Sequence, residues 1–249
     1  MSEVDWLLGP NAIEAQLADD PSRLLEVLVE QGRRTARIEA LLQGLKRHGV
    51  AVSSVPRETL DKRAGGERHQ GIAARFRLPE SLDDGDLPAL LESAGAAPLF
   101  LVLDGVTDPH NLGACIRSAA AAGATAVIVP KDRAVGLTPV VLRASAGTAV
   151  RMPLVRVTNL ARALEALKAR GVWVAGAAGE ASQLLYDCDL RGAMALVLGS
   201  EGEGLRELTR KTCDYLLKIP MHSAVESLNV SVAAGVFLFE AVRQRRKAG

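Results

Sequence analysis

Three short segments of the sequence gather amide, hydroxyl, carboxylate and guanidinium groups directly after apolar runs. They are DPHNLGACIRSA at 108–119, LGSEGEGL at 198–205 and IPMHSAVESLNVSVAAGVFLFE at 219–240. A helix N-cap explains one or two polar residues at the mouth of the last segment, but it does not explain five. These five are Ser223, Glu226, Ser227, Asn229 and Ser231. Such groups offer hydrogen bonds and charge to a ligand, so these segments are the candidates for chemistry.

The elements that must position these segments are a set of apolar runs without alternating polarity. The runs are PLFLVLDG, ATAVIVP, GVWVAGAAG, AMALVLGS and DYLLKIP, and helical segments lie between them. This pattern predicts strands buried on both faces of a mostly parallel sheet. Ligands of open parallel sheets bind beyond the carboxyl ends of the strands. All three polar segments fall at such ends, and we therefore expect ligand binding there.

Familiar nucleotide and hydrolase motifs are absent from the sequence. The glycine-rich loop at 199–204 has the order GxxGxG instead of GxGxxG, and it lies late in the chain. There is no GxxxxGK[ST] phosphate loop and no GxSxG serine elbow. Taken alone, this loop indicates only a turn from a buried strand into a helix.

The composition of the 249 residues is that of a folded, soluble protein, with 48% hydrophobic residues. No apolar run reaches the roughly 18 residues of a membrane span. The start, MSEVDWLLGPNAIEAQL, is acidic before it is apolar, unlike a signal peptide. Cys115, Cys188 and Cys213 lack the spacing of a disulfide framework or a zinc site. We therefore expect a cytoplasmic protein with no metal site and no membrane partner.

Positive charge is concentrated in one part of the chain, although the overall formal charge is only +1. Residues 31–77 hold eleven Lys and Arg against four acids, a net charge of +7. Such a segment can neutralise nucleic-acid phosphates and release counterions. On charge alone, an RNA-binding surface and a merely solvated helix face are equally good interpretations.

The sequence divides into two domains joined by an acidic stretch. ESLDDGDLPALLESAGAA, at 80–97, has Gly, Pro and Ser but no basic residue, and it predicts a flexible linker over 79–96. Before it, domain 1–78 shows an apolar segment at RLLEVLVE, strands at VAVSSV and GIAARF, and helices from Arg33 to His48 and after Pro56. Domain 97–249 holds the parallel sheet and all three polar segments.

The order and spacing of DPHNLGACIRSA, LGSEGEGL and IPMHSAVESLNVSVAAGVFLFE closely resemble the three motifs of the SpoU/TrmH family of RNA ribose 2'-O-methyltransferases, in the SPOUT superfamily. The resemblance covers roughly residues 97–246. The first domain, which ends in ERHQGIAARF, looks like the ribosomal protein L30e-like substrate-binding domain of one branch of this family. That branch methylates a guanosine of 23S ribosomal RNA.

The resemblance implies a fold and an activity that no periodicity reveals. We expect an α/β chain whose second domain forms a deep trefoil knot, although knots are essentially absent from most folds. The knot would hold the cofactor S-adenosylmethionine, with 219–231 as both knotted loop and cofactor wall. We also expect a homodimer formed through this domain. The implied partner is structured 23S ribosomal RNA, and neither DNA nor a membrane is expected.

The family motifs also imply roles for individual residues. Backbone and side chains expected to bind the cofactor are those of Leu198, Gly199, Ile219, Met221, Ser227 and Leu228. The expected catalytic residues are Asn111, Arg117, Glu201 and Asn229. A guanidinium stays protonated at working pH, so we assign Arg117 to an RNA phosphate and Glu201 to proton acceptance or orientation. The two asparagines are expected to position these groups.

Two other functions stay open at the level of sequence. The same chemistry on transfer RNA has the same motifs, and basic residues cannot distinguish the two substrates. A non-catalytic RNA-binding or ribosome-assembly factor could keep the fold, although the intact set of four candidate catalytic residues speaks against it. Mass mapping of ribosomal and transfer RNA distinguishes the two possible substrates. A methyl-transfer assay tests whether the protein is a non-catalytic factor.

Overall fold

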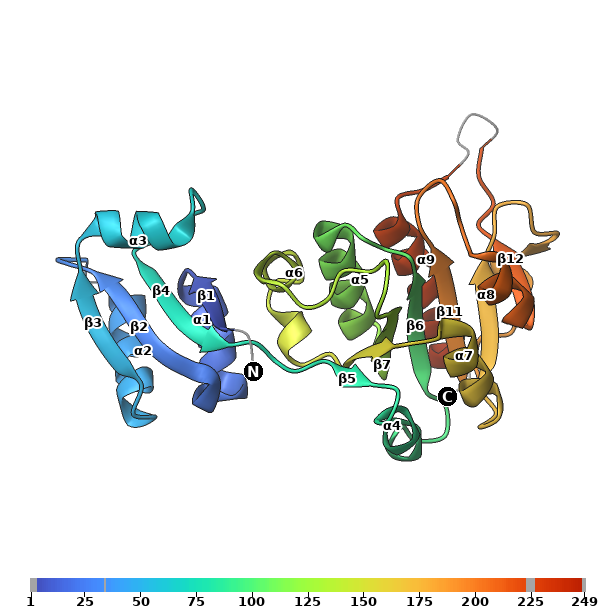
Figure 1. Cartoon of the computed structure of the whole chain (residues 1–249), viewed down its shortest axis with the longest axis horizontal. Helices are drawn as coiled ribbons and strands as arrows, with labels where there is room; N and C mark the ends of the chain where they lie inside the picture. Colours follow the sequence, from blue (N-terminus) through green and yellow to red (C-terminus); the bar gives the residue numbers. More distant parts are fainter. Residues whose placement is uncertain (1–3, 34, 223–226, 248–249) are drawn as a thin grey trace. The chain divides into compact units, whose positions relative to one another are not determined.

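The computed structural model describes residues 4–33, 35–222 and 227–247. Of the polar residues singled out in the third segment, Ser223 and Glu226 therefore lie outside the described residues, as does Arg34 of the basic segment. The chain divides into two compact units, Met1–Glu80 and Ser81–Gly249, each with its own sheet (Figure 1). No described helix has the length and apolar character needed to cross a membrane.

The first unit is built on a four-stranded mixed sheet in the order β1-β4-β2-β3. Strand β2 pairs in parallel with β3, whereas β4 pairs antiparallel with β1 and β2. The elements are β1 (Val4–Leu8), α1 (Pro10–Asp19), β2 (Leu24–Glu30), α2 (Ala36–Arg47), β3 (Ala51–Val55), α3 (Arg57–Ala64) and β4 (Ile72–Arg77). The expected strands at VAVSSV and GIAARF and the two expected helices are confirmed, and the apolar segment RLLEVLVE forms strand β2. Strand β1 and helix α1 are additions that the sequence pattern does not predict.

Helix α2 illustrates why this unit folds as it does. The Thr35 side chain caps the helix by accepting a hydrogen bond from the backbone N of Ile38 at 3.3 Å. Ile38, Leu41 and Leu45 follow at helical spacing and are buried. Their burial against the sheet anchors the helix, and it leaves the polar face with Lys46 and Arg47 in the last turn.

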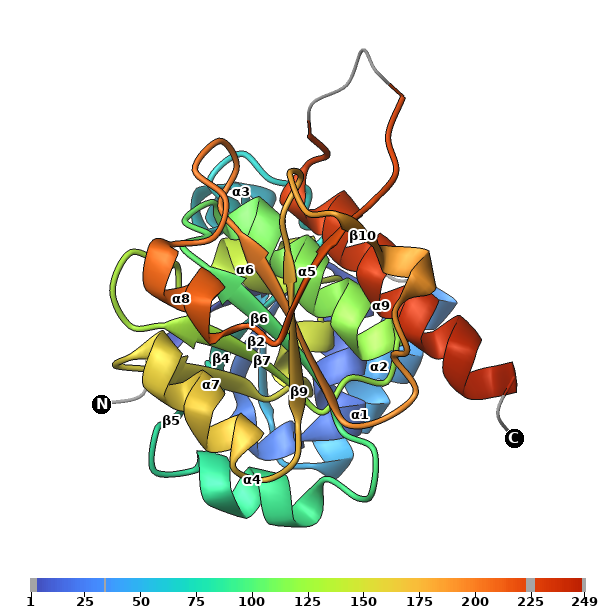
Figure 2. The same cartoon turned by 90° about the vertical axis from the view of Figure 1, so that its right-hand side faces the viewer.

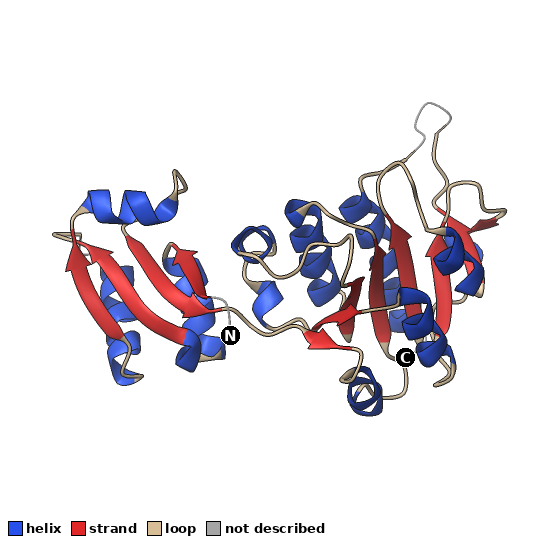
Figure 3. Cartoon of the chain, viewed as in Figure 1, coloured by secondary structure: helices blue, strands red, loops and turns tan. Residues whose placement is uncertain are grey.

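The second unit contains an eight-stranded sheet in the order β10-β12-β9-β11-β6-β7-β8-β5, and all its strand pairings are parallel. Its strands are β5 (Leu82–Asp83), β6 (Leu99–Asp104), β7 (Ala126–Pro130), β8 (Leu154–Val157), β9 (Trp173–Ala177), β10 (Gln183–Leu184), β11 (Met194–Gly199) and β12 (Tyr215–Lys218). Its helices are α4 (Leu87–Ser93), α5 (Pro109–Ala121), α6 (Pro139–Ala144), α7 (Leu160–Lys168), α8 (Glu207–Thr212) and α9 (Val230–Lys247). The predicted α/β class with a large parallel sheet is confirmed (Figure 3).

Helices cover both faces of this sheet. On one face, α4 and α7 bury leucines such as Leu87, Leu164 and Leu167 against Phe100 and Val197 of the strands. On the other face, α5 and α9 pack against each other and against β7 and β11 (Figure 2). Strands β6 and β7 are buried along their whole length, which explains their continuous apolar runs. Because all the strand pairings are parallel, the carboxyl ends of the strands lie at one edge of the sheet.

The segment 79–96, predicted as a flexible linker, contains ordered structure that belongs to the second unit. Strand β5 pairs with β8, and Leu87 of α4 lies in the core. Asp84 accepts hydrogen bonds from the backbone N and the hydroxyl of Thr158, at 2.9 and 2.8 Å. The prediction is corrected for a physical reason: the acids form a turn before α4, and the leucines between them face the core.

Arg245, near the end of α9, fastens this helix to the amino ends of two strands. Its guanidinium donates hydrogen bonds to the carbonyls of Ala97 at 2.9 Å, Pro98 at 3.3 Å, Leu190 at 3.3 Å and Gly192 at 2.6 Å. Partial burial lowers the pKa of Arg245 from its usual value. Because one guanidinium donates to four carbonyls, it holds the end of α9 against the two strands, and we call this contact a structural clamp.

We expect Arg245→Ala to lower the free energy of unfolding by about 2–4 kcal/mol, because several partly buried carbonyls lose a charged donor. Arg245→Lys should recover only part of this loss, since an ammonium cannot reach all four carbonyls. The measurement is the urea midpoint at constant m value, with exposed Arg246→Ala as the matched control. Equal midpoints for the two alanine variants would contradict the clamp.

Candidate active site

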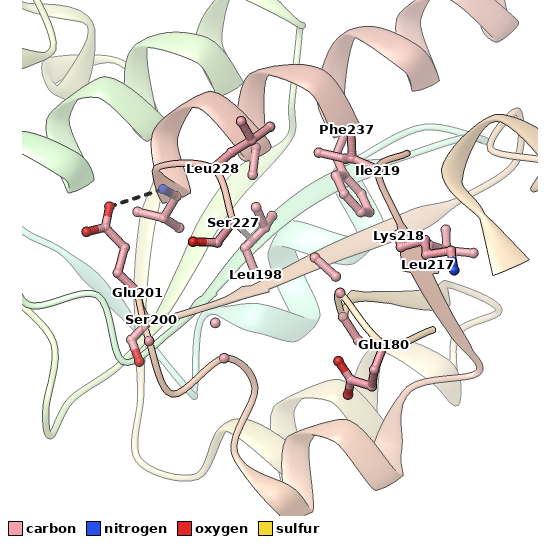
Figure 4. Close-up of a pocket in the computed structure, with 18 of the residues that line it drawn as sticks. Glu180, Leu198, Ser200, Glu201, Leu217, Lys218, Ile219, Ser227, Leu228 and Phe237 are labelled. Atoms are coloured by element: carbon pink, nitrogen blue, oxygen red, sulfur yellow. Dashed lines mark hydrogen bonds between the residues drawn. The ribbon is translucent and has the colours of Figure 1, made fainter. Parts of the chain in front are cut away.

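A cavity of about 420 Å³ lies beyond the carboxyl ends of β9, β11 and β12 (Figure 4). It lies where the three neighbouring strands end, as expected for a ligand site in a parallel sheet. All six residues expected to bind the cofactor line it, together with Glu201. The full lining is Ala177, Ala178, Gly179, Glu180, Leu198, Gly199, Ser200, Glu201, Gly202, Glu203, Gly204, Leu217, Lys218, Ile219, Met221, Ser227, Leu228, Val230, Ala233 and Phe237.

The glycine-rich loop after β11 forms one wall of this cavity by folding back on itself. The backbone N of Gly204 donates to the carbonyl of Ser200 at 3.0 Å. Gly202 and Gly204 have φ values of 86° and 68°, which favour glycine. A Cβ atom on Gly199 would overlap the backbone carbonyl of Gly204. The glycines are therefore needed for the tight loop. This explains why the sequence has a glycine-rich turn after the buried strand.

A buried carboxylate pins the far end of the same loop. Asp104, at the end of β6, is almost completely buried and forms an ion pair with Arg206. Its second oxygen accepts a hydrogen bond from the backbone N of Arg206 at 3.0 Å. Arg206 directly precedes α8, so the pair ties the exit of the loop to the neighbouring strand. A buried carboxylate needs such a partner, and the loop gains a fixed geometry from it.

Glu201 is the meeting point of all three polar segments. Its Oε1 accepts a hydrogen bond from Asn229 Nδ2 at 2.6 Å and from the backbone N of Val230 at 3.3 Å. Asn111 Nδ2 lies 3.5 Å from the same oxygen. Asn229 Nδ2 also donates to Asn111 Oδ1 at 3.0 Å. Three of the four expected catalytic residues thus form one cluster, and Glu201 joins it to the cavity.

Helix ends position the two asparagines of this cluster. Asp108 caps α5 by accepting from the backbone N of His110 at 3.0 Å, and Asn111 follows in the first turn. Asn229 precedes α9, and its Oδ1 accepts from the backbone N of Ser231 at 2.9 Å. Asn229 is therefore both a helix cap, through its oxygen, and a partner of Glu201, through its nitrogen. This double use explains the polar residue at position 229. Of the other described polar residues there, Ser231 donates its hydroxyl to Asn229 Oδ1 at 2.6 Å, and Ser227 lines the cavity.

Arg117 is not part of the cluster that the other three residues form. It is exposed on α5, more than one turn beyond Asn111, and it does not line the cavity. Within the described part of the chain, its side chain has no hydrogen bond or ion pair. Its guanidinium is therefore free to contact a ligand that approaches from solvent.

The loop after β9 is a part of the site that the sequence interpretation misses. Ala177, Ala178, Gly179 and Glu180 line the cavity opposite the glycine-rich loop. The pKa of Glu180 is lowered by its own backbone N–H and by its ion pair with Arg210. A signal did exist, because GVWVAGAAGE is also a strand followed by small residues at the same edge of the sheet. Phe237, which forms part of the lining, gave no signal beyond an apolar helix.

The chemistry of the site contains neither a thiolate nor a cluster of metal ligands. Burial raises the pKa of Cys115 and of Cys213 to about 12, so both thiols stay protonated. Across the described ranges, no group of three His, Cys, Asp or Glu residues is arranged to hold a metal ion. The arrangement offers a carboxylate, two amides and an apolar pocket with a glycine wall.

Comparison with known protein families decides where this site belongs. A family model described as the SpoU rRNA Methylase family matches residues 98–239, which contain the first two polar segments and all but the last residue of the third. The chain belongs to this family. The resemblance that the three motifs indicate is therefore confirmed. A second family model, described as RNA 2'-O ribose methyltransferase substrate binding, matches residues 6–82, so the SpoU methylase unit follows an RNA substrate-binding unit.

Similar SpoU family members cover nearly the whole chain. The 23S rRNA (guanosine-2'-O-)-methyltransferase RlmB of Photobacterium profundum is 54% identical over 97% of this chain and 98% of its own length. The enzyme of the same name from Xylella fastidiosa is 52% identical over 96% of both chains. A likeness at this level extends through both units.

Solved structures of SpoU-type proteins share the fold. A crystal structure described as an RNA 2'-O ribose methyltransferase has a TM-score of 0.81 and 29% identity, and the likeness covers 98% of this chain and 90% of that one. The SpoU methyltransferase AviRb from Streptomyces viridochromogenes, solved in complex with AdoMet, also has a TM-score of 0.81, with 25% identity over 99% of this chain and 92% of its own.

Proposed function

We propose that this protein transfers a methyl group from S-adenosylmethionine to the ribose 2'-hydroxyl of a guanosine in 23S ribosomal RNA. The observation that carries the proposal is the position of Glu201, which lines the cavity and accepts hydrogen bonds from the motif around Asn229. The near-complete coverage of the RlmB relatives at 54% and 52% identity supports the same substrate.

The cavity fits the cofactor in its chemistry. Leu198, Ile219 and Leu228 supply an apolar wall for a flat adenine, and Gly199 lets backbone approach the ligand closely. Met221 and Ser227 complete the expected set, and the lining also contains polar residues for the methionyl part, among them Glu180 and Ser200. S-adenosylmethionine would supply an electrophilic methyl group on a sulfonium, which leaves orientation and proton handling to the protein.

We expect Gly199→Ala to weaken S-adenosylmethionine binding by about tenfold or more, because a Cβ there overlaps Gly204 and displaces the loop. Calorimetric titration with the cofactor measures this. Gly192→Ala is the control, since a Cβ at that glycine meets nothing within 4 Å. Unchanged affinity in the Gly199 variant, with an unchanged melting temperature, would remove this loop from the cofactor site.

The remaining chemistry falls to the cluster and to Arg117. Glu201 would accept or orient the proton of the 2'-hydroxyl, with Asn229 and Asn111 holding the carboxylate in position. Arg117, exposed and without a partner in the described residues, would bind a phosphate beside the target ribose with its paired donors. The first domain, proposed as 1–78, would bring the RNA through its basic segment and 2'-hydroxyl contacts.

The finer features of the fold belong to the same proposal. We infer a trefoil knot around 219–231, supported by the SpoU family membership and by cavity residues on both sides of that segment. A homodimer is supported by Val232 and Phe239, which α9 leaves exposed. The first domain would be of the ribosomal protein L30e-like kind. A ribosomal RNA substrate implies reaction in the cytoplasm.

The decisive experiment supplies the purified full chain with methyl-labelled S-adenosylmethionine and either 23S ribosomal RNA or transfer RNA, both free of the modification. We expect label in 23S RNA alone, at one guanosine found by mass mapping. Label in transfer RNA would favour the alternative substrate. RNA binding with no transfer to either substrate would favour a non-catalytic assembly factor.

A further inference from the structure

A second cavity, of about 660 Å³, lies in the first unit, at the end of its sheet where β2 and β3 finish and β4 begins. Arg33 follows β2, Arg57 follows β3, and the loop 66–71 leads into β4. Asp61, on α3, completes the lining. Seven of the nine lining residues carry side chains, all of them polar. Three are guanidinium groups, including Arg68, and two are carboxylates, those of Asp61 and Glu67.

A chain of charged contacts connects two of these guanidinium groups. Glu30 Oε2 accepts a hydrogen bond from Arg33 Nη1 at 3.2 Å, and Glu30 Oε1 lies 4.0 Å from Arg57 Nη1. The Glu30 side chain is only 16% exposed, whereas Arg57 is 65% exposed and Arg33 42%. The carboxylate therefore sits behind the two cations. Their remaining N–H groups are available on the solvent side.

His69 anchors the loop at the back of the cavity. Its side chain is almost fully buried, and its Nδ1 accepts a hydrogen bond from the backbone N of Gly71 at 3.1 Å. The Nε2 atom therefore carries the proton and donates to Asp61 Oδ1 at 2.9 Å. Asp61 Oδ2 lies 3.8 Å from Arg57 Nε, so the same carboxylate joins the loop to the arginines. The cavity is thus held in shape before any ligand arrives.

The backbone of this loop adopts conformations that most residues avoid. Gly65, Gly66 and Gly71 have positive φ values, and so does Gln70, at 51°, which carries a side chain. A Cβ on Gly71 would overlap the Arg33 side chain. Within the described part of the chain, the backbone N–H groups of Arg68 and Gln70 have no acceptor. Strain kept in an exposed loop is typical of a binding site, and unpaired N–H groups suit an anion.

We propose that this cavity binds a phosphate group in the backbone of the RNA substrate, with Arg57 and Arg68 as its principal donors. The proposal rests on the proposed function, in which the substrate is RNA. Forked guanidinium groups and free backbone N–H groups match phosphate oxygens. The cavity lining contains no Phe, Tyr or Trp for stacking a base, and the ring of His69 is buried. The site would fix one point of the RNA on the first domain, independently of the chemistry in the second.

The test compares two doubly substituted full-length chains that lose the same charge. Arg57→Gln/Arg68→Gln alters the cavity. Lys46→Gln/Arg47→Gln alters the last turn of α2, which ends near the opposite, amino end of β3. The probe is a 23S ribosomal RNA transcript, titrated over a series of salt concentrations. Melting temperature and S-adenosylmethionine affinity are measured for every variant and are expected to stay at the values of the unsubstituted chain.

We expect the cavity variant to bind the transcript roughly tenfold more weakly at about 0.1 M salt, with the slope of log K against log salt reduced by about 2. Arg57→Lys/Arg68→Lys should recover the slope but not the full affinity, because lysine lacks the paired donors. Equal losses in the two glutamine variants would overturn the proposal in favour of diffuse charge. RNA binding is measured directly in this experiment. If the protein showed no methyl transfer, that result would contradict the proposed function, but the comparison of RNA binding between the variants would still be valid.

Discussion

Arg117→Ala is expected to lower the single-turnover rate of methyl transfer by about 10²-fold or more, with S-adenosylmethionine affinity unchanged. Arg117 does not line the cofactor cavity, so the cofactor loses no contact. The proposed loss is in the alignment of the ribose, because the phosphate beside it would no longer be held. Rapid quenching with saturating RNA and labelled cofactor measures the rate, and calorimetry measures the affinity.

The lysine variant tests the reason for this expected loss. Arg117→Lys keeps the positive charge but not the paired donors, and it should recover little activity. Arg162→Ala, which removes an exposed arginine from α7 on the other face of the sheet, is the matched control and should leave the rate unchanged. Near-normal turnover by the lysine variant would refute the positioning argument, since a point charge would then suffice.

Glu201→Gln is expected to reduce kcat by about 10²-fold with little change in RNA or cofactor affinity. The amide keeps the size of the side chain and can still accept from Asn229, but it cannot take up a proton. An interaction made mainly in the transition state gives this pattern. Steady-state kinetics with separate binding titrations distinguish kcat from affinity.

The control for Glu201 is Glu207→Gln, which makes the same change in charge on α8, outside the cavity lining. Its ion pair with Lys211 is exposed, so its removal should alter neither kcat nor folding. If Glu201→Gln instead weakens RNA binding and leaves kcat intact, Glu201 is a structural residue of the loop, and proton acceptance must be assigned elsewhere.

The central strands could be predicted because their burial is complete. Val102, Ile128 and Val197 stand in continuous apolar runs, which a parallel sheet covered on both faces requires. Strand β8, LVRV, was not predicted because it is short and Arg156 interrupts its apolar residues. Helix α4 was not predicted because acidic residues surround its leucines. Only the packing of Leu87 in the core reveals that the segment is ordered.

The site was predictable to the extent that it depends on motif residues. The three loops resembled a family, and the structure brings Asn111, Glu201 and Asn229 together as one cluster. The pair of Asp104 and Arg206 could not be foreseen, because 102 positions separate its members and neither has a local signal. Arg117 is separated from the cluster because it lies on a different part of helix α5 from Asn111. The sequence interpretation grouped the two residues by motif and did not consider their positions around the helix.

The residues that complete the cluster come late in the chain. Asn229 and the start of α9 are synthesised after every strand of the large sheet, whereas the basic first unit leaves the ribosome early. On the proposed role of the first unit in RNA binding, a nascent chain would hold RNA before Glu201 has its amide partner. Prematurely terminated products that lack α9 would compete for RNA without modifying it. The full-length chain is thus needed for the complete cluster, because its last partner for Glu201 lies at the start of the final helix.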